Sequence, residues 1–292
     1  MLVQLRLQNF RCFNDHIVPF RPCTIIVGRN NAGKSTLVDA LRLVSIVTAR
    51  YRTLAFRSAP DWADIPAREV GLSPSIDGME FNVQNLFHRY GEPPAVVTAT
   101  FSNGSSTKIY IGPAGKLHVV LIDADGRIIR NRASAPEGFL PRVEIMPQVA
   151  PVQRSEIILD PGYVRRNLSS VLSPAHFRNQ LNLLSDRFPR LQALAEQTWR
   201  GLRIEELTGA GAARGRELQL LVRNEDYVSE LSTMGHGLQM WLQTMWFLAR
   251  VEESSTVTLD EPDVYMHPDL QRRLIRHLRT SHPQVIVTTH SV

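Results

Sequence analysis

The residues of this sequence best suited to chemistry are two glycines, a lysine and two hydroxyl side chains close together. Gly28 and the run Gly33-Lys34-Ser35-Thr36 have the spacing G-x-x-x-x-G-K-[ST]. The glycines let the chain curl so that successive backbone N–H groups point inward, and the N-terminus of a following helix attracts anions. This arrangement predicts a cradle for the phosphates of a nucleotide. The predicted contacts are Gly28, Asn30, Asn31, Ala32, Gly33, Lys34, Ser35 and Thr36.

Three side chains of this loop have separate expected tasks. Lys34 would bridge the β- and γ-phosphates, Ser35 would ligate Mg²⁺ and Thr36 would reach the α-phosphate. Average composition produces the pattern by chance in roughly one chain per hundred of this length. An apolar strand pattern before the loop and a helical pattern after it make a chance match rarer still.

Two adjacent carboxylates, Asp260 and Glu261, end the apolar and β-branched run 257–259. Strand alternation predicts that they lie on different sides of the strand. One can hold Mg²⁺, directly or through water, and the other can polarise the water that attacks the γ-phosphate. Alone, the pair could equally be solvated acids at a strand end. The phosphate loop favours the catalytic interpretation.

Two further segments end in polar residues that could meet phosphate. The run 285–289 predicts a strand that delivers His290 near the γ-phosphate if it lies parallel to the acidic strand. Ser232, Gly235 and Gly237 precede a predicted helix over 238–249 and could form a second phosphate-binding helix N-terminus. The alternative is a plain turn capped by Ser232 or Thr233. Two such termini in one chain suggest a nucleotide held between two subunits.

The elements that must position these residues follow from hydrophobic periodicity. A fully apolar run over 24–27 predicts a buried parallel strand, and apolar residues at helical spacing predict a helix over 37–47. Asn103-Gly104 and Asp125-Gly126 separate short strands, so residues 95–130 are expected to form antiparallel hairpins. A helical hairpin is expected over 174–200, followed by strands over 202–207 and 217–222.

Composition limits the class of protein. The chain has 292 residues, of which 43% are hydrophobic and 21% charged, which excludes wholesale disorder, collagen and a pure coiled coil. It contains no apolar run of transmembrane length and does not open like a signal peptide, so a cytoplasmic location without membrane contact is expected. Cys12 and Cys23 are expected to be ordinary packing residues, since two thiols cannot close a zinc site. The net charge of +5 permits nucleic acid as a partner without requiring it.

In this order the motifs resemble the ABC-type ATPase heads, especially the OLD-like and RecF/SMC-like branch. The resemblance begins with the opening LQNFRCF (7–13) and the phosphate loop. The segment DEPDVYMHP (260–268) is similar to the Walker B motif and D-loop of that branch, and TTHS (288–291) to its switch histidine. Residues 234–239 are similar to a divergent signature motif. These proteins are AAA-type ATP-binding proteins of prokaryotic defence or DNA-maintenance systems.

The resemblance implies an α/β fold of the P-loop NTPase class. It would be an ABC-ATPase-like head with a mixed or parallel core sheet, an antiparallel β-subdomain and a helical insertion. We expect a single head over 1–292. Its nucleotide-binding core would comprise 1–50 and 230–292, with an irregular and antiparallel β insertion at 51–140 and a helical and linking region at 141–229.

The resemblance also implies a homodimer that sandwiches ATP and Mg²⁺ between two heads. The triphosphate held by Lys34 and Asp260 of one subunit would meet the signature loop, with Ser232, Gly235 and Gly237, of the other. Hydrolysis would open the dimer. His236 departs from the pattern, because a small hydroxyl residue is common at this place in the family.

Individual roles also follow from the resemblance. Glu261 would be the catalytic base, supported by His290 and Lys34, and Asp260 would hold Mg²⁺ together with Ser35. Arg11 is expected to contact nucleotide, and Gln148 or Gln153 to serve as the glutamine-bearing loop of the family.

The expected function is an ATP-hydrolysing switch that controls a separate effector protein in anti-phage defence or DNA maintenance. One alternative is a DNA-binding repair-type head, for which arginines at 165–166, 187, 190 and 272–279 are available. Another is the ATPase portion of an OLD-like nuclease, whose acidic Toprim ligands are not visible in this sequence. A transporter subunit fits the opening less well.

Overall fold

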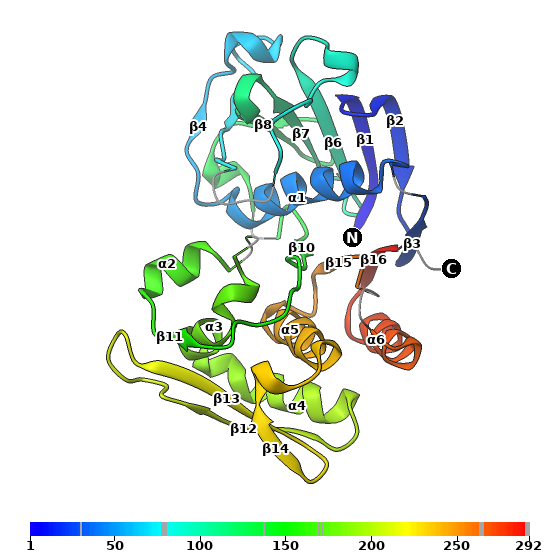
Figure 1. The fold of residues 1–292 in the computed structure, drawn as a ribbon. Coiled ribbons are helices and arrows are strands. Elements are labelled where there is room, and N and C mark those ends of the chain that lie inside the picture. Colours follow the sequence, from blue (N-terminus) through cyan, green and yellow to red (C-terminus); the bar gives the residue numbers. More distant parts are fainter. Residues whose placement is uncertain are drawn as a thin grey trace.

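The computed structural model describes residues 1–29, 31–76, 81–136, 138–168, 170, 172–262 and 266–289. Its three sheets and their helices follow one another from the top to the bottom of Figure 1. Helix α1 (Lys34–Arg50) lies between the upper sheet and the elements below it. The architecture is mixed α/β, as the sequence predicts. Within the described ranges, no helix is long and apolar enough to cross a bilayer.

The upper sheet is antiparallel and has the order β2-β1-β6-β7-β8-β5-β4, with β9 paired to β8. The predicted hairpins are confirmed, and they turn at Gly104 and Gly126, whose φ angles are 82° and 80°. The sheet extends beyond the residues expected for it, because β1 pairs with β6 and turns Leu5 and Leu7 into the same core as Val97. Its strands are β1 (Leu2–Phe10), β2 (Phe13–Pro19), β4 (Phe56–Arg57), β5 (Gly71–Leu72), β6 (Ala95–Phe101), β7 (Ser106–Ile111), β8 (Leu117–Ile122) and β9 (Ile128–Ile129).

The second sheet is parallel and carries the predicted chemical motifs. Its order is β10-β15-β16-β3, with β3 (Cys23–Val27), β10 (Val143–Ile145), β15 (Thr256–Asp260) and β16 (Gln284–Thr289). The predicted parallel strand over 24–27 is present, but its predicted burial is wrong. The side chains of Ile25 and Val27, which alternation places on the same face of this edge strand, are 53% and 47% exposed. An apolar run indicates a strand without saying whether another element covers it.

The lower part of the molecule combines a third sheet with helices. Trp241 and Trp246 of α5 are fully buried in the second hydrophobic core, together with Ile204 of β12. The predicted helical hairpin is confirmed as α3 and α4, and Pro189 lies in the first turn of α4, where proline is tolerated. The strands are β11 (Glu156–Ile157), β12 (Leu202–Thr208), β13 (Glu217–Asn224) and β14 (Tyr227–Glu230); the helices are α2 (Pro161–Arg166), α3 (Phe177–Leu183), α4 (Phe188–Thr198), α5 (His236–Arg250) and α6 (Pro268–Ser281).

A buried glutamine joins the upper sheet to the parallel sheet. The Gln284 Oε1 atom accepts hydrogen bonds from the Leu2 N–H and the Thr256 hydroxyl, both at 2.8 Å, and Nε2 donates to the Leu2 carbonyl at 2.7 Å. The start of β1 is thereby fixed against the strands that carry the acidic motif. The short 3₁₀ helices are η1 (Asp61–Ala63), η2 (His88–Tyr90), η3 (Pro113–Gly115), η4 (Arg132–Ser134), η5 (Pro174–His176), η6 (Ser185–Arg187) and η7 (Leu231–Thr233).

Candidate functional site

The carboxyl ends of three parallel strands meet at one edge of the second sheet. Thr288 of β16 pairs with Asp260 of β15 on one side and with Ile26 of β3 on the other, and Thr289 pairs with Val27. The phosphate loop begins directly after Val27, so this register brings the loop and the acidic strand end to the same edge. Ligands of open α/β sheets bind at such carboxyl edges.

The phosphate loop has the backbone geometry that its glycines predict. Gly33 has a φ of 93°, and a β-carbon at this position would lie 2.9 Å from Cζ of Phe13. Lys34 begins α1 and is buried, and its Nζ donates to the carbonyls of Gly28 at 2.7 Å and Arg29 at 3.3 Å. The ammonium group therefore lies under the curl of the loop.

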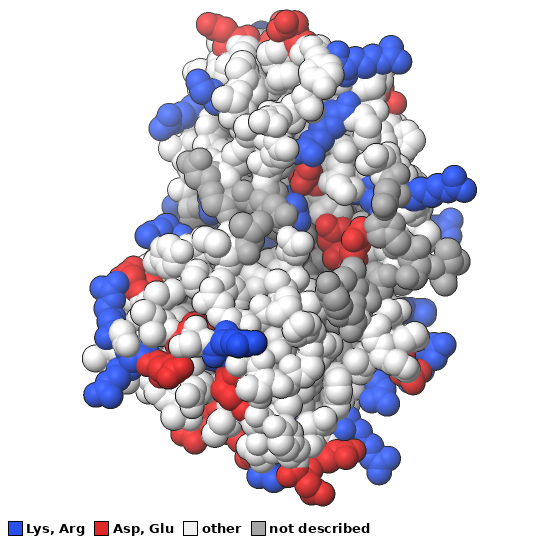
Figure 2. Space-filling model, in the orientation of Figure 1, with Lys and Arg blue, Asp and Glu red and all other residues white. Residues whose placement is uncertain are grey.

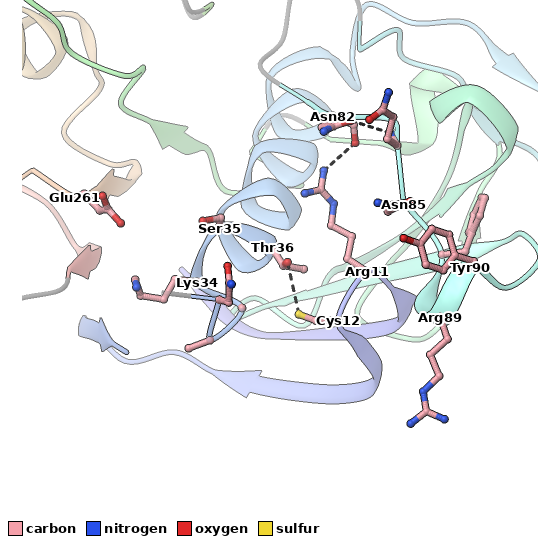
Figure 3. Close-up of a pocket in the computed structure, with 15 residues that line it drawn as sticks. Arg11, Cys12, Lys34, Ser35, Thr36, Asn82, Asn85, Arg89, Tyr90 and Glu261 are labelled. Atoms are coloured by element: carbon pink, nitrogen blue, oxygen red, sulfur yellow. Dashed lines mark hydrogen bonds between the residues drawn. The ribbon is translucent and has the colours of Figure 1, made fainter. Parts of the chain in front are cut away.

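A cavity of about 630 Å³ opens in front of this loop (Figure 3). Lys34, Ser35 and Thr36 line it from α1, and Glu261 lines it from the end of β15. The cavity thus brings together one cation, two hydroxyls and one carboxylate that sequence reasoning assigned to one site. Its lining comprises Arg11, Cys12, Asn31, Ala32, Gly33, Lys34, Ser35, Thr36, Asn82, Gln84, Asn85, Phe87, Arg89, Tyr90 and Glu261.

The two acids are oriented by backbone and hydroxyl contacts. The Thr288 hydroxyl donates to Oδ1 of Asp260 at 2.5 Å, and Oδ2 lies 4.0 Å from Nη2 of Arg42. Glu261 does not continue the strand as alternation predicts. Its φ is 47°, and its N–H donates to the Thr288 carbonyl at 3.0 Å, so a left-handed turn directs the residue to the cavity.

The far wall of the cavity is a segment that sequence reasoning treated as irregular. Asn82, Asn85 and Tyr90 belong to it, and Tyr90 is 82% exposed. The turn between β1 and β2 holds this wall in place, because the Arg11 N–H donates to the Leu86 carbonyl at 2.9 Å. The sequence signal was a cluster of amide and aromatic side chains over 81–90, which only the folded chain connects to the phosphate loop.

Arg11 lines the cavity and also joins its two walls. Its Nη2 donates to the Asn82 carbonyl at 2.8 Å, and its Nη1 pairs with Asp39 of α1 at 2.7 Å. Asp39 pairs in turn with Arg42 at 3.2 Å. Arg11, Asp39, Arg42 and Asp260 therefore form a row of alternating charges from the far wall to the acidic strand end.

Cys12 is not the packing residue that was expected. It is exposed and lines the cavity, and its Sγ lies 3.6 Å from the Thr36 hydroxyl. The turn between two strands brings it to the phosphate loop. No group of three or more residues able to hold a metal through His, Cys, Asp or Glu occurs among the described residues.

Several expected contacts, Gly28 and Asp260 among them, lie outside the cavity lining. Gln148 is exposed on the segment after β10, and Ser232, Gly235 and Gly237 lie before or in the first turn of α5. Gly235 is the N-cap of α5 and supplies no side-chain hydrogen bond, so neither Ser232 nor Thr233 caps this helix. Asn30 and His290 lie outside the described residues.

Two family models match the parts of the chain that contain the phosphate loop and the acidic strand end. Residues 1–84 match the family described as "AAA ATPase domain". Residues 146–292, which are half of the chain, match the family described as "AAA domain, putative AbiEii toxin, Type IV TA system". The chain belongs to this AAA domain family. The first match covers the phosphate loop of the AAA domain, and the second covers its acidic strand.

Relatives of the AAA domain agree with the predicted branch. The OLD nuclease of Thermus scotoductus is 24% identical over 319 aligned residues, which include all of this chain and 59% of the nuclease. The chain therefore spans less than two thirds of that relative.

Solved structures show the fold of the AAA domain to be an ABC-like head. An SMC head bound to the C-terminal winged-helix domain of ScpA has a TM-score of 0.59 at 15% identity, covering 99% of this chain and 90% of that one. The SMC head from Pyrococcus furiosus, bound to the C-terminal domain of ScpA, has a TM-score of 0.54 at 15% identity, covering 99% and 89%. The RecF–ATP structure has a TM-score of 0.52 at 12% identity, covering 100% and 94%.

Proposed function

We propose that this AAA domain binds ATP with Mg²⁺ in the cavity in front of α1 and hydrolyses it. The observation that carries the proposal is the joint lining of one cavity by Lys34, Ser35 and Glu261, which come from opposite ends of the sequence. Lys34 neutralises the β- and γ-phosphates and stabilises the charge that develops during transfer. Glu261 accepts a proton from the attacking water.

We assign Mg²⁺ to Ser35, which lines the cavity, and to Asp260, which directly precedes the lining residue Glu261. Ser35 is exposed in the cavity, and the Thr288 hydroxyl fixes one carboxylate oxygen of Asp260. Oxygen ligands of this kind suit Mg²⁺, which usually retains several waters and contacts substrate phosphates. When bound, Mg²⁺ would neutralise charge on the β- and γ-phosphates. Arg42, 4.0 Å from Asp260, keeps that carboxylate beside a positive charge.

The far wall is proposed to hold the nucleoside end of ATP. Tyr90 offers an exposed aromatic face, and Asn82 and Asn85 offer amides to the same cavity (Figure 3). Aromatic stacking and hydrogen bonds to base edges are the usual means of holding a nucleobase. Arg11 contacts the nucleotide between the two ends in this arrangement.

The signature loop is proposed to act on the ATP of a second copy of the chain. Ser232, Gly235 and Gly237 do not line the cavity of their own chain, and α5 begins without a side-chain cap. Uncapped N–H groups at a helix start attract phosphate. A head-to-head homodimer would place them against the partner's triphosphate, with Gln148 near the junction and His290 as the γ-phosphate sensor.

The proposed role is a switch that passes its nucleotide state to a separate effector protein in defence or DNA maintenance. The likeness to the OLD nuclease over the whole chain supports this branch. If a nuclease function accompanied the ATPase, a plasmid incubated with the protein and a divalent metal would be nicked. Intact supercoiled plasmid would exclude nuclease activity of this chain.

Hydrolysis tests the core proposal. Wild-type protein with ATP and Mg²⁺ should release phosphate, and both Lys34→Ala and Glu261→Gln should reduce the rate at least a hundredfold, since each removes a group that acts in the transition state. Direct titration should show that Glu261→Gln still binds ATP and that Lys34→Ala does not. Equal rates in all three proteins would contradict the proposal.

DNA binding is a second candidate function, supported by the exposed face of α6. Arg276 and Arg279 are exposed and have no carboxylate partner among the described residues, and Arg272 pairs only with Asp269 on the same helix. Figure 2 shows Lys and Arg side chains gathered over this part of the molecule. Duplex affinity should fall steeply with salt, and Arg276→Ala with Arg279→Ala should weaken it. No binding at low salt would dismiss this function.

A further inference from the structure

A buried group of three charged side chains lies below the nucleotide site. Arg178 of α3 is fully buried between Glu156 of β11, which is 3% exposed, and Glu230 of β14. The guanidinium donates to Glu230 Oε1 through Nε at 2.9 Å and Nη2 at 2.5 Å, and its Nη1 lies 3.3 Å from Glu156 Oε2. Glu156 also accepts the N–H groups of Arg178 at 3.0 Å and Asn179 at 2.7 Å. The charges of this triad are thus paired with each other and with backbone donors.

The triad connects two segments that are distant in the sequence. Arg178 Nη1 donates to the carbonyl of Gln153, in the segment after β10, at 3.1 Å. On the other side, Glu230 accepts the N–H of Ser232 at 2.7 Å and its hydroxyl at 2.5 Å. Burial alone would raise the pKa of Glu230, but hydrogen bonds from Ser232 and Arg178 outweigh it and lower that pKa. The carboxylate is therefore held in its charged form.

A glutamine of α5, Gln239, makes a second link between the same two segments. Gln239 accepts the Val152 N–H at 2.9 Å through Oε1, while its Nε2 donates to the carbonyls of Met234 at 2.8 Å and Ser232 at 3.3 Å. One turn further along the helix, Gln243 donates to the Ala150 carbonyl at 2.7 Å and so ties segment 150–153 to α5 itself. Both glutamines are buried. Segment 150–153 and loop 230–235 are therefore joined at two independent places.

Stability alone does not account for a polar connection of this kind. A buried ion triad is on balance about as stable as apolar side chains of the same volume, because desolvation offsets the attraction between its charges. What it adds is geometry, since each carboxylate oxygen and guanidinium nitrogen has one satisfactory position. The Gln153 carbonyl and the Ser232 N–H, which bond to the triad, are thereby held in fixed positions.

We infer that Arg178 and Gln239 are positioning residues that lock segment 150–153 to loop 230–235, so that the two move as one body. The functional consequence of this lock, a nucleotide-driven movement of loop 230–235, rests on the proposed function. Segment 150–153 follows the strand that flanks the acidic strand, while loop 230–235 is the part proposed to contact the partner's triphosphate. A nucleotide-driven shift of the first would carry the second with it.

Hydrogen exchange of the nucleotide-free protein tests the lock without relying on ATP. Glu230→Gln removes the charge that pairs with Arg178, and we expect exchange to accelerate about tenfold in both 148–154 and 231–237, as one opening unit. The matched control is Glu205→Gln, which breaks the exposed Arg223–Glu205 pair of the same sheet and should change neither segment. Acceleration confined to 231–237 would overturn the inference.

A second variant protects the test against misfolding. Gln239→Ala removes the other link and leaves the triad intact, so it should also accelerate exchange in both segments together. If Glu230→Gln shows no cooperative thermal transition, that variant is not folded, and the exchange of Gln239→Ala tests the inference by itself. Acceleration of only one segment in Gln239→Ala would contradict the lock.

Hydrogen exchange in the presence of ATP and Mg²⁺ distinguishes a failure of the lock between the two segments from a failure of the proposed ATP binding. On adding ATP and Mg²⁺, protection of wild-type protein should change in both segments, whereas in Glu230→Gln the change in 148–154 should persist and that in 231–237 should be lost. Absence of ATP binding by wild-type protein would reject the proposed function, and the nucleotide-free comparison would still decide the lock. A wild-type response in 148–154 alone would overturn the lock and leave ATP binding intact.

Discussion

Lys34 shows how single residues are prepared for their proposed tasks. Its ammonium group donates to the carbonyls of Gly28 and Arg29, so the lysine is held against the loop that is proposed to bind the phosphates. The same ammonium group can form charge-assisted hydrogen bonds to phosphate oxygens. Asp260 is similarly prepared, by the Thr288 hydroxyl and the charge of Arg42.

Tyr90 should contribute to ATP affinity through the nucleoside alone. Tyr90→Ala is expected to weaken ATP binding about tenfold, because one base–aromatic stack is worth ~1–3 kcal/mol. Affinity for inorganic tripolyphosphate should not change, and Tyr90→Phe should restore ATP affinity. The control is Tyr227→Ala, which removes another exposed tyrosine on β14. Calorimetric titration compares the wild type with these three variants; an equal loss of affinity for ATP and for tripolyphosphate in Tyr90→Ala would contradict this role.

His282, at the end of α6, should make stability depend on pH. Burial lowers its pKa below the usual value, and the nearby charges of His277 and Arg190 lower it further. As pH falls, the unfolded chain therefore takes up the proton first, near pH 6.5. The free energy of unfolding should hold above that pH and decline below it. Thermal midpoints at pH 7.5 and 5.5 should differ less in His282→Asn than in wild type. An equal fall in the thermal midpoint between pH 7.5 and 5.5 in His282→Asn and in wild type would refute the prediction.

At the scale of elements, the turn between β1 and β2 organises the site. It supplies Arg11 and Cys12 to the cavity, abuts the phosphate loop through Phe13, and bonds the far wall through Leu86. The start of β1 is itself fixed by Gln284. An antiparallel hairpin thus connects the phosphate loop, the far wall and the parallel sheet.

Gly33→Ala tests how closely this turn approaches the phosphate loop. A β-carbon at Gly33 meets the Phe13 ring at 2.9 Å and must also adopt a φ of 93°. ATP affinity should fall at least tenfold, and the free energy of unfolding should fall by ~1–2 kcal/mol. The control is Gly126→Ala, which has a φ of 80° but meets no atom within 4 Å. It should cost ~1 kcal/mol of stability and leave ATP affinity unchanged. Unchanged ATP affinity in Gly33→Ala would contradict the proposed close fit.

Local patterns predicted most elements, because local residues form them. Asn103-Gly104 and Asp125-Gly126 gave the hairpins, and helical periodicity gave α1 and α5. Features that depend on residues distant in the sequence were not predicted. The exposure of Ile25 and Val27 depends on what packs against one face of the sheet, which the local pattern of β3 does not reveal. Strand β11 has two residues and is defined by its pairing with β13.

The candidate site divides in the same way. The phosphate loop and the acidic strand end were predicted, because their residues are contiguous and the chemistry requires them together. The far wall was not predicted, since bonds to the distant residues Asn9 and Arg11 hold residues 82–90 at the cavity. The left-handed turn at Glu261 also replaced the alternation that the strand predicted.

At the scale of the whole molecule, the chain has two faces of proposed function. The cavity lies beside the upper sheet and α1, while loop 230–235 lies at the start of α5 in the lower part of the molecule. A single chain does not bring them together in one cavity. A symmetric pair of heads would use both faces of each copy, as a two-fold interface allows.

The most direct test of this account is the mass of Glu261→Gln in saturating ATP and Mg²⁺, measured by sedimentation velocity. Because the variant should bind ATP without hydrolysing it, we expect a species of about twice the 33.0 kDa chain mass. The double variant Lys34→Ala/Glu261→Gln should not form this species. A variant that binds ATP by titration yet sediments only as a 33.0 kDa monomer would contradict the shared nucleotide on which the account depends.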